Sequence, residues 1–306
     1  ILGDTAAHFF RDHRNFKLYR GDVSDFKFLS GVFEKETFDA IVHIAARAGV
    51  RQSIQNPELY CRVNIDGTFY LLELAKAHGV KDFVFASSSS VYGKNSKMPF
   101  EENDAAHHPI SPYAATKRAA ELLIHSYAHL YGLNCAVLRF FTVYGERGRP
   151  DMAPYLFTKA MLSGGEIVQF GDGNSKRDYT YVGDIADGVV GCLGKQFGYE
   201  VINLGSNKPI ALKEFIGTLE RVTAQKARVV LQPEQPGDVP VTFANISKAK
   251  KLLGYDPRVA LSDGIKRAIA WGKEWDTVSK ERFSTSSNNK YSSSERSESR
   301  SFPKKK

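Results

Sequence analysis

Two side chains spaced one helical turn apart, Tyr113 and Lys117, have the residue types of a proton-transfer pair. They lie in the segment Ser-Pro-Tyr-Ala-Ala-Thr-Lys, where Pro112 can open a helix and the four-residue spacing puts both on one helix face. A free phenol has a pKa of about 10, and an ammonium within about 4–6 Å favours the phenolate. Such a pair can remove a proton near neutral pH. The spacing also fits a half-buried tyrosine beside a solvated lysine, so the pair alone leaves both explanations open.

A run of serines upstream supports the chemical explanation. Ser87, Ser88, Ser89 and Ser90 directly follow the apolar stretch 83–86 and precede Val-Tyr-Gly. Hydroxyls just past the carboxyl end of a parallel strand lie where ligands bind in open α/β sheets. A flexible surface loop is the other explanation for a serine run. It fits poorly here, because a linker would not be joined to a buried strand.

The elements that must position these groups alternate along the chain. The predicted strands are residues 16–19, 40–45, 83–86, 135–141 and 200–204, and the two longest predicted helices are 57–78 and 112–131. This alternation is typical of βαβ units and a parallel sheet. We therefore predict an α/β fold, a Rossmann-like doubly wound parallel sheet that lacks its first βαβ unit and carries a smaller C-terminal domain.

The chain divides into three predicted parts, 1–150, 151–276 and 277–306. The second part begins where glycine-rich turns and a proline-rich stretch replace the regular alternation. It should be interleaved with the first part, because residues 200–204 resemble a strand that returns to the main sheet. The third part is rich in Ser, Lys and Arg, with almost no apolar residues, and should be disordered.

Composition excludes several classes of function. The formal charge is +8, but the segment 280–306 carries eight Lys and Arg against three Glu, so the rest has an ordinary balance that does not indicate nucleic-acid binding. The distant cysteines Cys61, Cys135 and Cys192 suggest reduced thiols and a cytoplasmic protein. No apolar run is long enough to span a membrane, although an anchor ahead of Ile1 stays open. His125 and His129 are one turn apart, but no third ligand accompanies them, so no metal is expected.

Taken together, the motifs resemble those of a known family. They are Arg-Gly-Asp-Val at 20–23, His-Ile-Ala-Ala-Arg-Ala-Gly-Val-Arg at 43–51, Asn64 with Gly67-Thr68, the serine run, residues 113–117, Arg-Phe-Phe-Thr-Val-Tyr-Gly at 139–145, Gly-Arg-Pro-Asp-Met at 148–152, Arg-Asp-Tyr-Thr-Tyr at 177–181 and Pro-Gly-Asp-Val at 236–239. In this order they resemble the extended short-chain dehydrogenase/reductases, the NAD-dependent epimerase/dehydratase family. Within that family they are most similar to the UDP-glucuronate 4-epimerases.

The resemblance implies a function and a site. It implies an NAD-dependent UDP-sugar 4-epimerase, in which the sugar is transiently oxidised at C4, with a homodimer formed through the helices 57–78 and 112–131. Residues 1–150 would bind NAD and 151–276 the UDP-sugar. The implied catalytic residues are Tyr113 as base, Lys117 as its electrostatic partner and Ser88 as a bridging hydroxyl. Cofactor contacts are implied for Asp22, Val23, Ala45, Ala46, Asn64, Tyr113, Lys117 and Phe140. Substrate contacts are implied for Arg51, Ser89, Ser90, Thr142, Arg149, Met152, Arg177 and Asp238.

Two features of the sequence bear on the choice of reaction. Related dehydratases carry Thr-Asp-Glu where this chain has Ser88-Ser89-Ser90, and without a carboxylic acid there dehydration is disfavoured. Arg149 suits a glucuronate carboxylate, because its fork of N–H donors matches two oxygens, although a solvated loop arginine is the alternative. A UDP-sugar decarboxylase on the same scaffold also stays open.

One family motif is missing. No G-x-x-G-x-x-G precedes Asp22, although in the family that loop holds the cofactor pyrophosphate at a helix N-terminus. The sequence as given is therefore expected to bind NAD weakly and to have a gap between the strands 16–19 and 40–45. A degenerate paralogue without catalysis stays open beside the epimerase.

Overall fold

A four-stranded parallel sheet forms the centre of the fold. The computed structural model describes residues 13–94, 97–233 and 240–285, with side chains up to residue 273. The strands are β1 (Ala40–His43), β2 (Asp82–Ser88), β3 (Asn134–Phe140) and β7 (Tyr199–Leu204), in the order β1-β2-β3-β7. β2 and β3 are buried along nearly their whole length, which fits their almost continuous apolar sequences.

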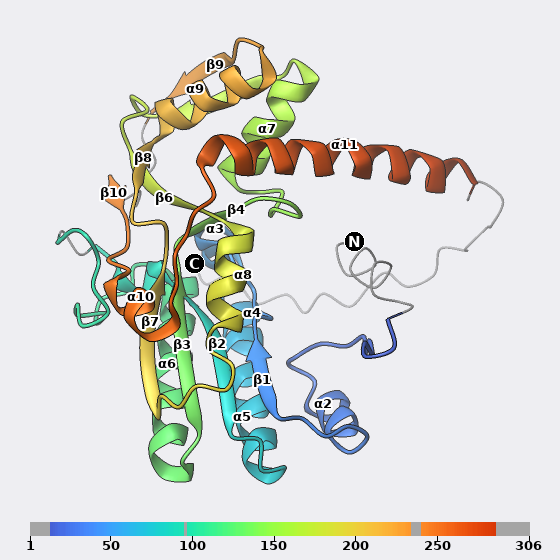
Figure 1. Cartoon of the computed structure of the whole chain (residues 1–306), viewed down its shortest axis with the longest axis vertical. Helices are drawn as coiled ribbons and strands as arrows, with labels where there is room; N and C mark the ends of the chain where they lie inside the picture. Colours follow the sequence, from blue (N-terminus) through green and yellow to red (C-terminus); the bar gives the residue numbers. More distant parts are fainter. Residues whose placement is uncertain (1–12, 95–96, 234–239, 286–306) are drawn as a thin grey trace, which may run out of the picture.

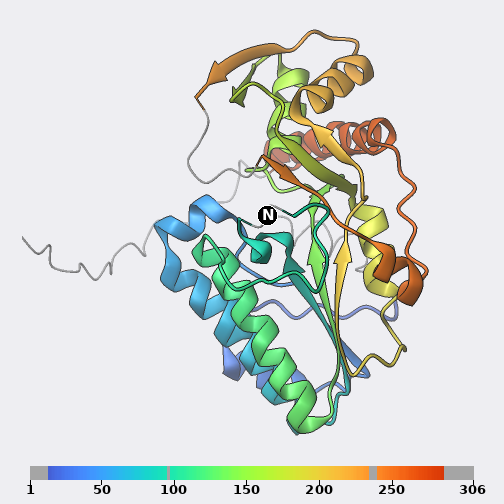
Figure 2. The ribbon, with the colours of Figure 1, turned by 90° about the vertical axis from the view of Figure 1, so that its left-hand side faces the viewer.

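Helices cover both faces of this sheet (Figure 2). On one face, α2 (Phe26–Phe33), α5 (Gly67–Ala77) and α6 (Pro112–Tyr131) share a core with Phe83, Phe85, Cys135 and Val137. On the other, α8 (Val182–Val190) and α10 (Ser247–Leu253) share a core with Val84, Ala136, Leu138, Ile202 and Leu204. Alternate strand residues thus enter opposite cores, as strand geometry requires, and the predicted doubly wound α/β fold is confirmed.

The two long helices predicted from the sequence are present. The region predicted as 57–78 begins after the short α3 (Val50–Gln55) and consists of α4 (Pro57–Cys61), a π-helical turn, η1 (Arg62–Asp66), and α5. The helix predicted over 112–131 is α6. It starts at Ser111, whose hydroxyl accepts from the Ala114 N–H at 3.1 Å, and ends at Gly132, which has a φ of +66°.

A second group of elements stands above the carboxyl ends of the sheet (Figure 1). Its strands are β4 (Thr142–Tyr144), β6 (Lys176–Tyr181), β8 (Pro209–Ala211) and β10 (Val241–Thr242), together with the separate pair β5 (Glu166–Phe170) and β9 (Arg228–Gln232). Its helices are α7 (Ala153–Ser163), α9 (Leu212–Thr223) and α11 (Leu261–Thr285). We call this group the upper lobe and the sheet with its covering helices the sheet lobe. Because β7 and α10 belong to the sheet lobe, the two lobes are interleaved in sequence.

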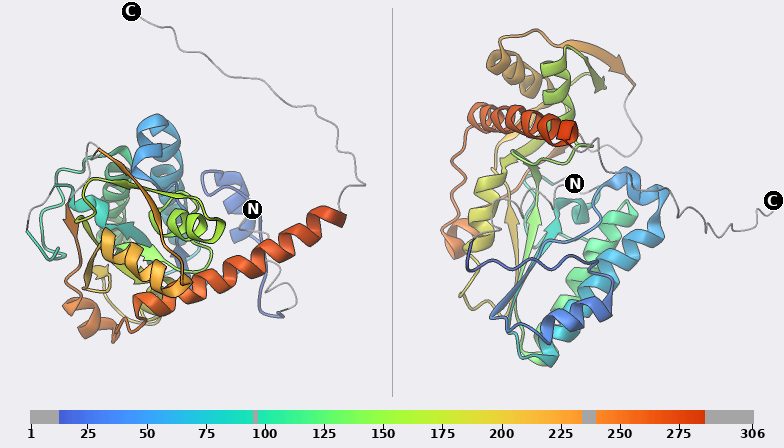
Figure 3. Two further views of the ribbon diagram at one scale, coloured as in Figure 1. Left: turned by 90° about the horizontal axis from the view of Figure 1, so that it is seen from above. Right: turned by 90° about the vertical axis from the view of Figure 1, so that its right-hand side faces the viewer.

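Two sequence predictions about secondary structure are wrong. Residues 16–19 form no strand and are largely exposed, because no strand lies beside them to complete their backbone hydrogen bonds; Lys17 and Tyr19 instead bond Glu36 through their side chains. α11 continues past residue 277, where a disordered tail was expected, and projects from the upper lobe (Figure 3). Residues 286–306 of that predicted tail lie outside the described residues.

The strand β1 is shorter than predicted, ending at His43, and in the described part of the chain it pairs with β2 alone. Val42 in β1 and Ile44, which directly follows it, are 39% and 55% exposed. At the position of the expected gap, the described sheet thus ends at β1, and apolar side chains there are exposed.

Candidate active site

The carboxyl end of β2 and the first turn of α6 bring Ser88 and Tyr113 together. Ser88 is the last residue of β2 and is buried, and Tyr113 is half-buried. Burial raises the pKa of Tyr113, and the nearby Ser88 hydroxyl and the charge of Arg149 only partly counteract this rise. The phenol is therefore protonated in the protein alone, and it needs a further positive influence to act as a base.

Lys117 lies one turn further along α6 and points into the sheet lobe. Its Nζ donates to the Ala86 carbonyl at 2.7 Å and lies 4.6 Å from the centre of the Phe85 ring. Burial lowers the pKa of Lys117 to about 7, against the opposing charge of Glu121. The ammonium is thus poised between its two protonation states near neutral pH, the range in which enzymes use such groups.

Asn64 fixes the loop that follows β1. It lies in the π-helical turn and is buried; its amide oxygen accepts from the Arg47 N–H at 2.8 Å, and its amide nitrogen donates to the Arg47 carbonyl and to the Thr116 hydroxyl, each at 3.0 Å. Such π turns are frequent at functional sites. Asn64 therefore connects the loop containing Ala45 and Ala46 to the helix that carries Tyr113.

The other residues predicted to contact the cofactor surround the same end of the sheet. Ala45 is exposed and Ala46 half-buried in the loop after β1, and Phe140 is the half-buried last residue of β3. Asp22 and Val23 lie just before α2, where hydrogen bonds from Ser24 lower the pKa of Asp22. Val23 packs against the core beneath α2 and α5. These residues form a band of small and half-buried side chains along the strand ends.

The residues predicted to bind the sugar acid lie between the lobes. Ser89 and Ser90 begin the short helix η2 (Ser89–Tyr92), and Thr142 begins β4; all three are half-buried. Arg149 holds Asp151 with two hydrogen bonds, Nε to Oδ1 at 3.1 Å and Nη2 to Oδ2 at 2.6 Å, and it is partly exposed. Its charge also acts on Tyr113, so Arg149 belongs to the same electrostatic environment as the candidate base.

The residues predicted to contact the rest of the substrate are not gathered into one cluster. Arg51, on α3, is exposed and lies over the ring of Phe170, with its guanidinium carbon 5.4 Å from the ring centre. Arg177, on β6, donates to the Lys176 carbonyl at 2.9 Å and to the Pro240 carbonyl at 3.5 Å. Asp238 lies outside the described residues. Met152 precedes α7 and lines a pocket with Arg149.

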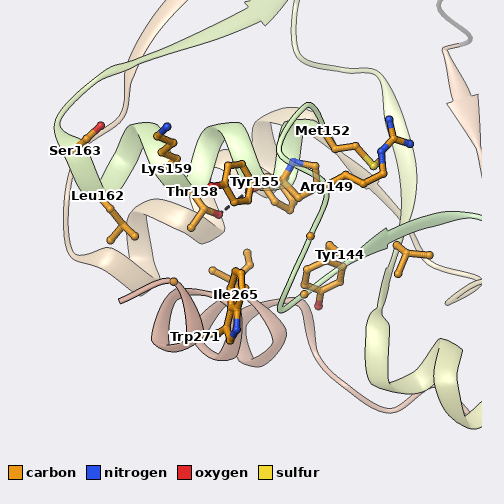
Figure 4. Close-up of a pocket in the computed structure, with 17 residues that line it drawn as sticks. Tyr144, Arg149, Met152, Tyr155, Thr158, Lys159, Leu162, Ser163, Ile265 and Trp271 are labelled. Carbon is orange, nitrogen blue, oxygen red and sulfur yellow. Dashed lines mark hydrogen bonds between the residues drawn. The ribbon is translucent and has the colours of Figure 1, made fainter. Parts of the chain in front are cut away.

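That pocket has a volume of about 290 Å³ and lies between α7 and α11 (Figure 4). Tyr155, Thr158, Lys159 and Leu162 face it from α7, and Ile265 and Trp271 face it from α11. Its wall is largely apolar, and Arg149 stands at the end nearer Met152. Tyr113 and Ser88 do not line it, so this cavity adjoins the candidate chemistry without containing it.

Sequence reasoning missed two groups around the site. The Tyr60 ring meets the Tyr113 ring edge-on at 6.2 Å between centroids, while its hydroxyl donates to the Ala48 carbonyl at 2.8 Å. Glu121 is buried and bonds Ser87 and Arg139 beneath the serine run. Nothing local in the sequence indicates these contacts, although Glu121 does continue the spacing of four from Tyr113 and Lys117.

The described part of the chain has neither a metal-ion cluster nor a membrane-spanning helix. No cluster of three or more His, Cys, Asp or Glu side chains suited to a metal ion occurs there. None of the described helices has both the length and the apolar character that crossing a membrane requires.

Comparisons with known proteins agree with this geometry. The family described as GDP-mannose 4,6 dehydratase matches residues 4–268. A UDP-glucuronate 4-epimerase of Thermodesulfobacterium geofontis is 49% identical over 261 residues, which are 85% of this chain and 80% of that protein. Among solved structures, a UDP-glucuronic acid 4-epimerase of Bacillus cereus, in complex with UDP-glucuronic acid and NAD, is 35% identical with a TM-score of 0.82, covering 90% of this chain and 87% of that one.

A second solved structure is similar to the same degree. The UDP-glucose 4-epimerase of Thermotoga maritima, with UDP-glucose, is 32% identical with a TM-score of 0.82, and 86% of each chain is covered. The resemblance that the sequence motifs indicate is therefore confirmed over nearly the whole described fold. The chain belongs to the GDP-mannose 4,6 dehydratase family of NAD-dependent epimerases and dehydratases.

Proposed function

We propose that this protein is an NAD-dependent UDP-sugar 4-epimerase that interconverts UDP-glucuronate and UDP-galacturonate. One observation carries the proposal: Tyr113 lies next to Ser88 at a strand end, close enough for the serine hydroxyl to lower its pKa, and the buried amine of Lys117 lies one helical turn along α6. The relatives that act on UDP-glucuronic acid support the choice of substrate. The lack of a carboxylic acid at Ser89 and Ser90 argues against a dehydratase.

In the proposed reaction Tyr113 takes the proton of the sugar 4-hydroxyl and later returns it. Ser88 bridges the phenol and the sugar oxygen and so orients both. Burial raises the pKa of Tyr113, and Lys117, in its charged form, would favour the phenolate and so oppose that rise when the reaction proceeds. When bound, NAD would supply the hydride chemistry at sugar C4. The flat 4-keto sugar must turn over before the hydride returns to its opposite face.

The residues at the strand ends fit the nicotinamide and ribose part of NAD. Lys117 presents three N–H donors, and the described residues give it the single acceptor Ala86. Ala45 and Ala46 have side chains small enough for a flat ring to approach the loop after β1, and Phe140 offers an apolar surface. Asp22, with Val23 beside it, would accept from the adenine end, and Asn64 would hold the loop in place.

The acidic sugar would be bound between the lobes. Arg149 already binds one carboxylate, that of Asp151, through two donors, and the glucuronate carboxylate would compete for the same fork. The hydroxyls of Thr142, Ser89 and Ser90 would donate further hydrogen bonds to the glucuronate carboxylate. We assign Arg51, Met152, Arg177 and Asp238 to the nucleotide and diphosphate part. On this basis residues 1–150 form most of the cofactor domain and 151–276 most of the substrate domain, with β7, α8 and α10 returning to the first and β4 belonging to the second.

We further propose a cytoplasmic homodimer. Its interface would be the outer side of α5 and α6, which exposes Phe69 and Leu122. A pair of long helices from each protomer would form a four-helix bundle. Light scattering on the full-length protein should give a dimer, and Leu122→Asp should shift it towards monomer.

A direct assay tests the proposed function. The full-length protein, supplied with NAD and UDP-glucuronate, should form UDP-galacturonate without release of carbon dioxide. Carbon dioxide from the labelled acid would instead identify a decarboxylase. No turnover of UDP-glucuronate or UDP-glucose would contradict the proposal and favour a protein without catalysis.

A further inference from the structure

A fully buried carboxylate lies two turns along α6 from Tyr113. Each oxygen of Glu121 accepts two hydrogen bonds: Oε1 from the Ser87 hydroxyl at 2.5 Å and from Arg139 Nε at 3.0 Å, and Oε2 from Arg139 Nη2 and Arg118 Nη1, both at 2.8 Å. Burial would raise the pKa of Glu121, but these donors and the charge of Arg139 outweigh it and lower the pKa. Glu121 therefore carries a negative charge inside the sheet lobe.

The position of Glu121 continues a regular series of contacts. Tyr113, Lys117 and Glu121 follow one another at intervals of one turn on α6. Two of them make hydrogen bonds to the end of β2: Lys117 donates to the Ala86 carbonyl at 2.7 Å, and Glu121 accepts from the Ser87 hydroxyl at 2.5 Å. These two contacts fix the rotation and height of α6 against β2, where Tyr113 lies next to Ser88.

Glu121 is also the carboxylate whose charge acts on Lys117. From β1, His43 faces Lys117, but burial lowers its pKa to about 3, so it is neutral and bonds Thr68 at 3.0 Å. From β2, Lys117 meets the Phe85 ring and the Ala86 carbonyl. Burial lowers the pKa of Lys117, and Glu121 is the charged group that raises it.

We propose that Glu121 is a positioning residue for the epimerase chemistry: it holds α6 in register through Ser87 and supplies the negative charge that keeps Lys117 cationic beside Tyr113. This inference depends on the proposed function for its catalytic meaning. Apolar residues of similar volume often stabilise a core as well as a buried ion pair does. A charge at this position is therefore better explained by its effect on Lys117 than by stability.

The protonation of Lys117 can be measured directly, without an enzymatic assay. Protein labelled with carbon-13 at the lysine side chains would be titrated by NMR, and Lys117→Met would assign the Lys117 signal. We expect Lys117 to titrate at a lower pH in Glu121→Gln than in the native protein, and close to the native pH in Glu121→Asp, which keeps the charge. Glu200→Gln is the matched control, because Glu200 lies in the same sheet and pairs with Lys248 at 2.5 Å.

Two kinds of variant separate the charge of Glu121 from its contact with β2, which sets the register of α6. Ser87→Ala removes the contact to β2 and keeps the carboxylate, so it should leave the Lys117 titration unchanged. If Glu121→Gln does not fold, because the charge of Arg139 is left unpaired, the double variant Glu121→Gln, Arg139→Gln removes both charges; it should still give a downward shift, but a smaller one, because loss of the Arg139 cation acts in the opposite direction. An unchanged titration in whichever of these two variants folds would overturn the inference.

The enzymatic measurement is the dependence of kcat/KM on pH. In Glu121→Gln the alkaline limb should move to lower pH, because Lys117 loses its proton earlier, and Glu121→Asp should restore it. A uniform loss of rate with an unmoved limb would indicate a merely structural role and overturn the inference. If the native protein has no epimerase activity, the proposed function fails, and the NMR titration still decides whether Glu121 controls Lys117.

Discussion

The two lobes hold their functional side chains in different ways. In the sheet lobe, Lys117, Asn64 and Glu121 are buried, and each has hydrogen-bond partners on another element. In the upper lobe and at its border, Arg149 and Arg51 are partly or fully exposed, and Arg149 makes its ion pair with Asp151, two residues away in the chain. Buried groups held by hydrogen bonds to another element are preorganised, whereas exposed ion pairs contribute little and exchange partners readily. The buried groups of the sheet lobe would thus determine which reaction is catalysed. The exposed arginines at the border of the upper lobe would determine which sugar is bound.

The largest effect should come from removing the phenol of the sheet lobe. Tyr113→Phe keeps the ring and its packing against Tyr60, so UDP-sugar binding should change little. The rate should fall by about 10²–10⁴, the usual contribution of a general acid or base. Steady-state kinetics and calorimetric titration of the same preparation would measure both. Near-normal turnover would refute the catalytic assignment, and Tyr131→Phe on the same helix is the control.

Lys117→Met should abolish most activity and yet stabilise the fold. Burial lowers the pKa of Lys117 from 10.5 to about 7, so the unfolded state binds the proton more tightly than the native state. The resulting cost to stability grows as pH falls from 10.5 to about 7 and is constant below that. Urea unfolding at pH 7 and pH 10 should therefore show a larger gain for Lys117→Met at pH 7. An equal gain at both pH values would contradict the buried-charge interpretation.

Arg149, at the border of the upper lobe, should determine which sugar is used rather than the rate with every sugar. Arg149→Ala should lower kcat/KM for UDP-glucuronate by about 10- to 100-fold, the range for losing one charged hydrogen-bonding partner, and affect UDP-glucose much less. The comparison needs both sugars with each variant. Arg147→Ala, which changes a neighbouring arginine, is the control. Equal losses on the two sugars would remove the acidic-substrate assignment and leave the epimerase intact.

Ser88→Ala should have the smallest effect of the four. Its hydroxyl lies 3.1 Å from the Ser90 hydroxyl, so Ser90 or a water molecule can bridge part of the gap to the sugar. We expect a loss of about tenfold, close to the value of one hydrogen bond. The double variant Ser88→Ala, Ser90→Ala should lose more than the two single losses combined, and a merely additive result would show that Ser90 does not substitute.

The sequence predicts the parts of this fold that local patterns determine. The apolar runs predict β2 and β3, and Ser111, Pro112 and Gly132 mark both ends of α6. The prediction fails at residues 16–19, where a strand-like composition has no neighbouring strand. Contacts between distant residues also leave no local signal: Arg139 and Glu121 meet across 18 residues, and Tyr92 and Asn203 across 111.

The interleaved order of the two lobes has a mechanical consequence. The chain enters the upper lobe at β4, returns to the sheet lobe with α8 and β7, leaves it with β8 and α9, and returns again with α10 before α11. Several segments of the chain therefore cross the border between the lobes. We expect these multiple connections to resist wide opening or twisting of one lobe against the other more than a single linker would. A single proteolytic cut in an upper-lobe loop would leave two fragments that remain associated, because each carries elements that the other needs for its core.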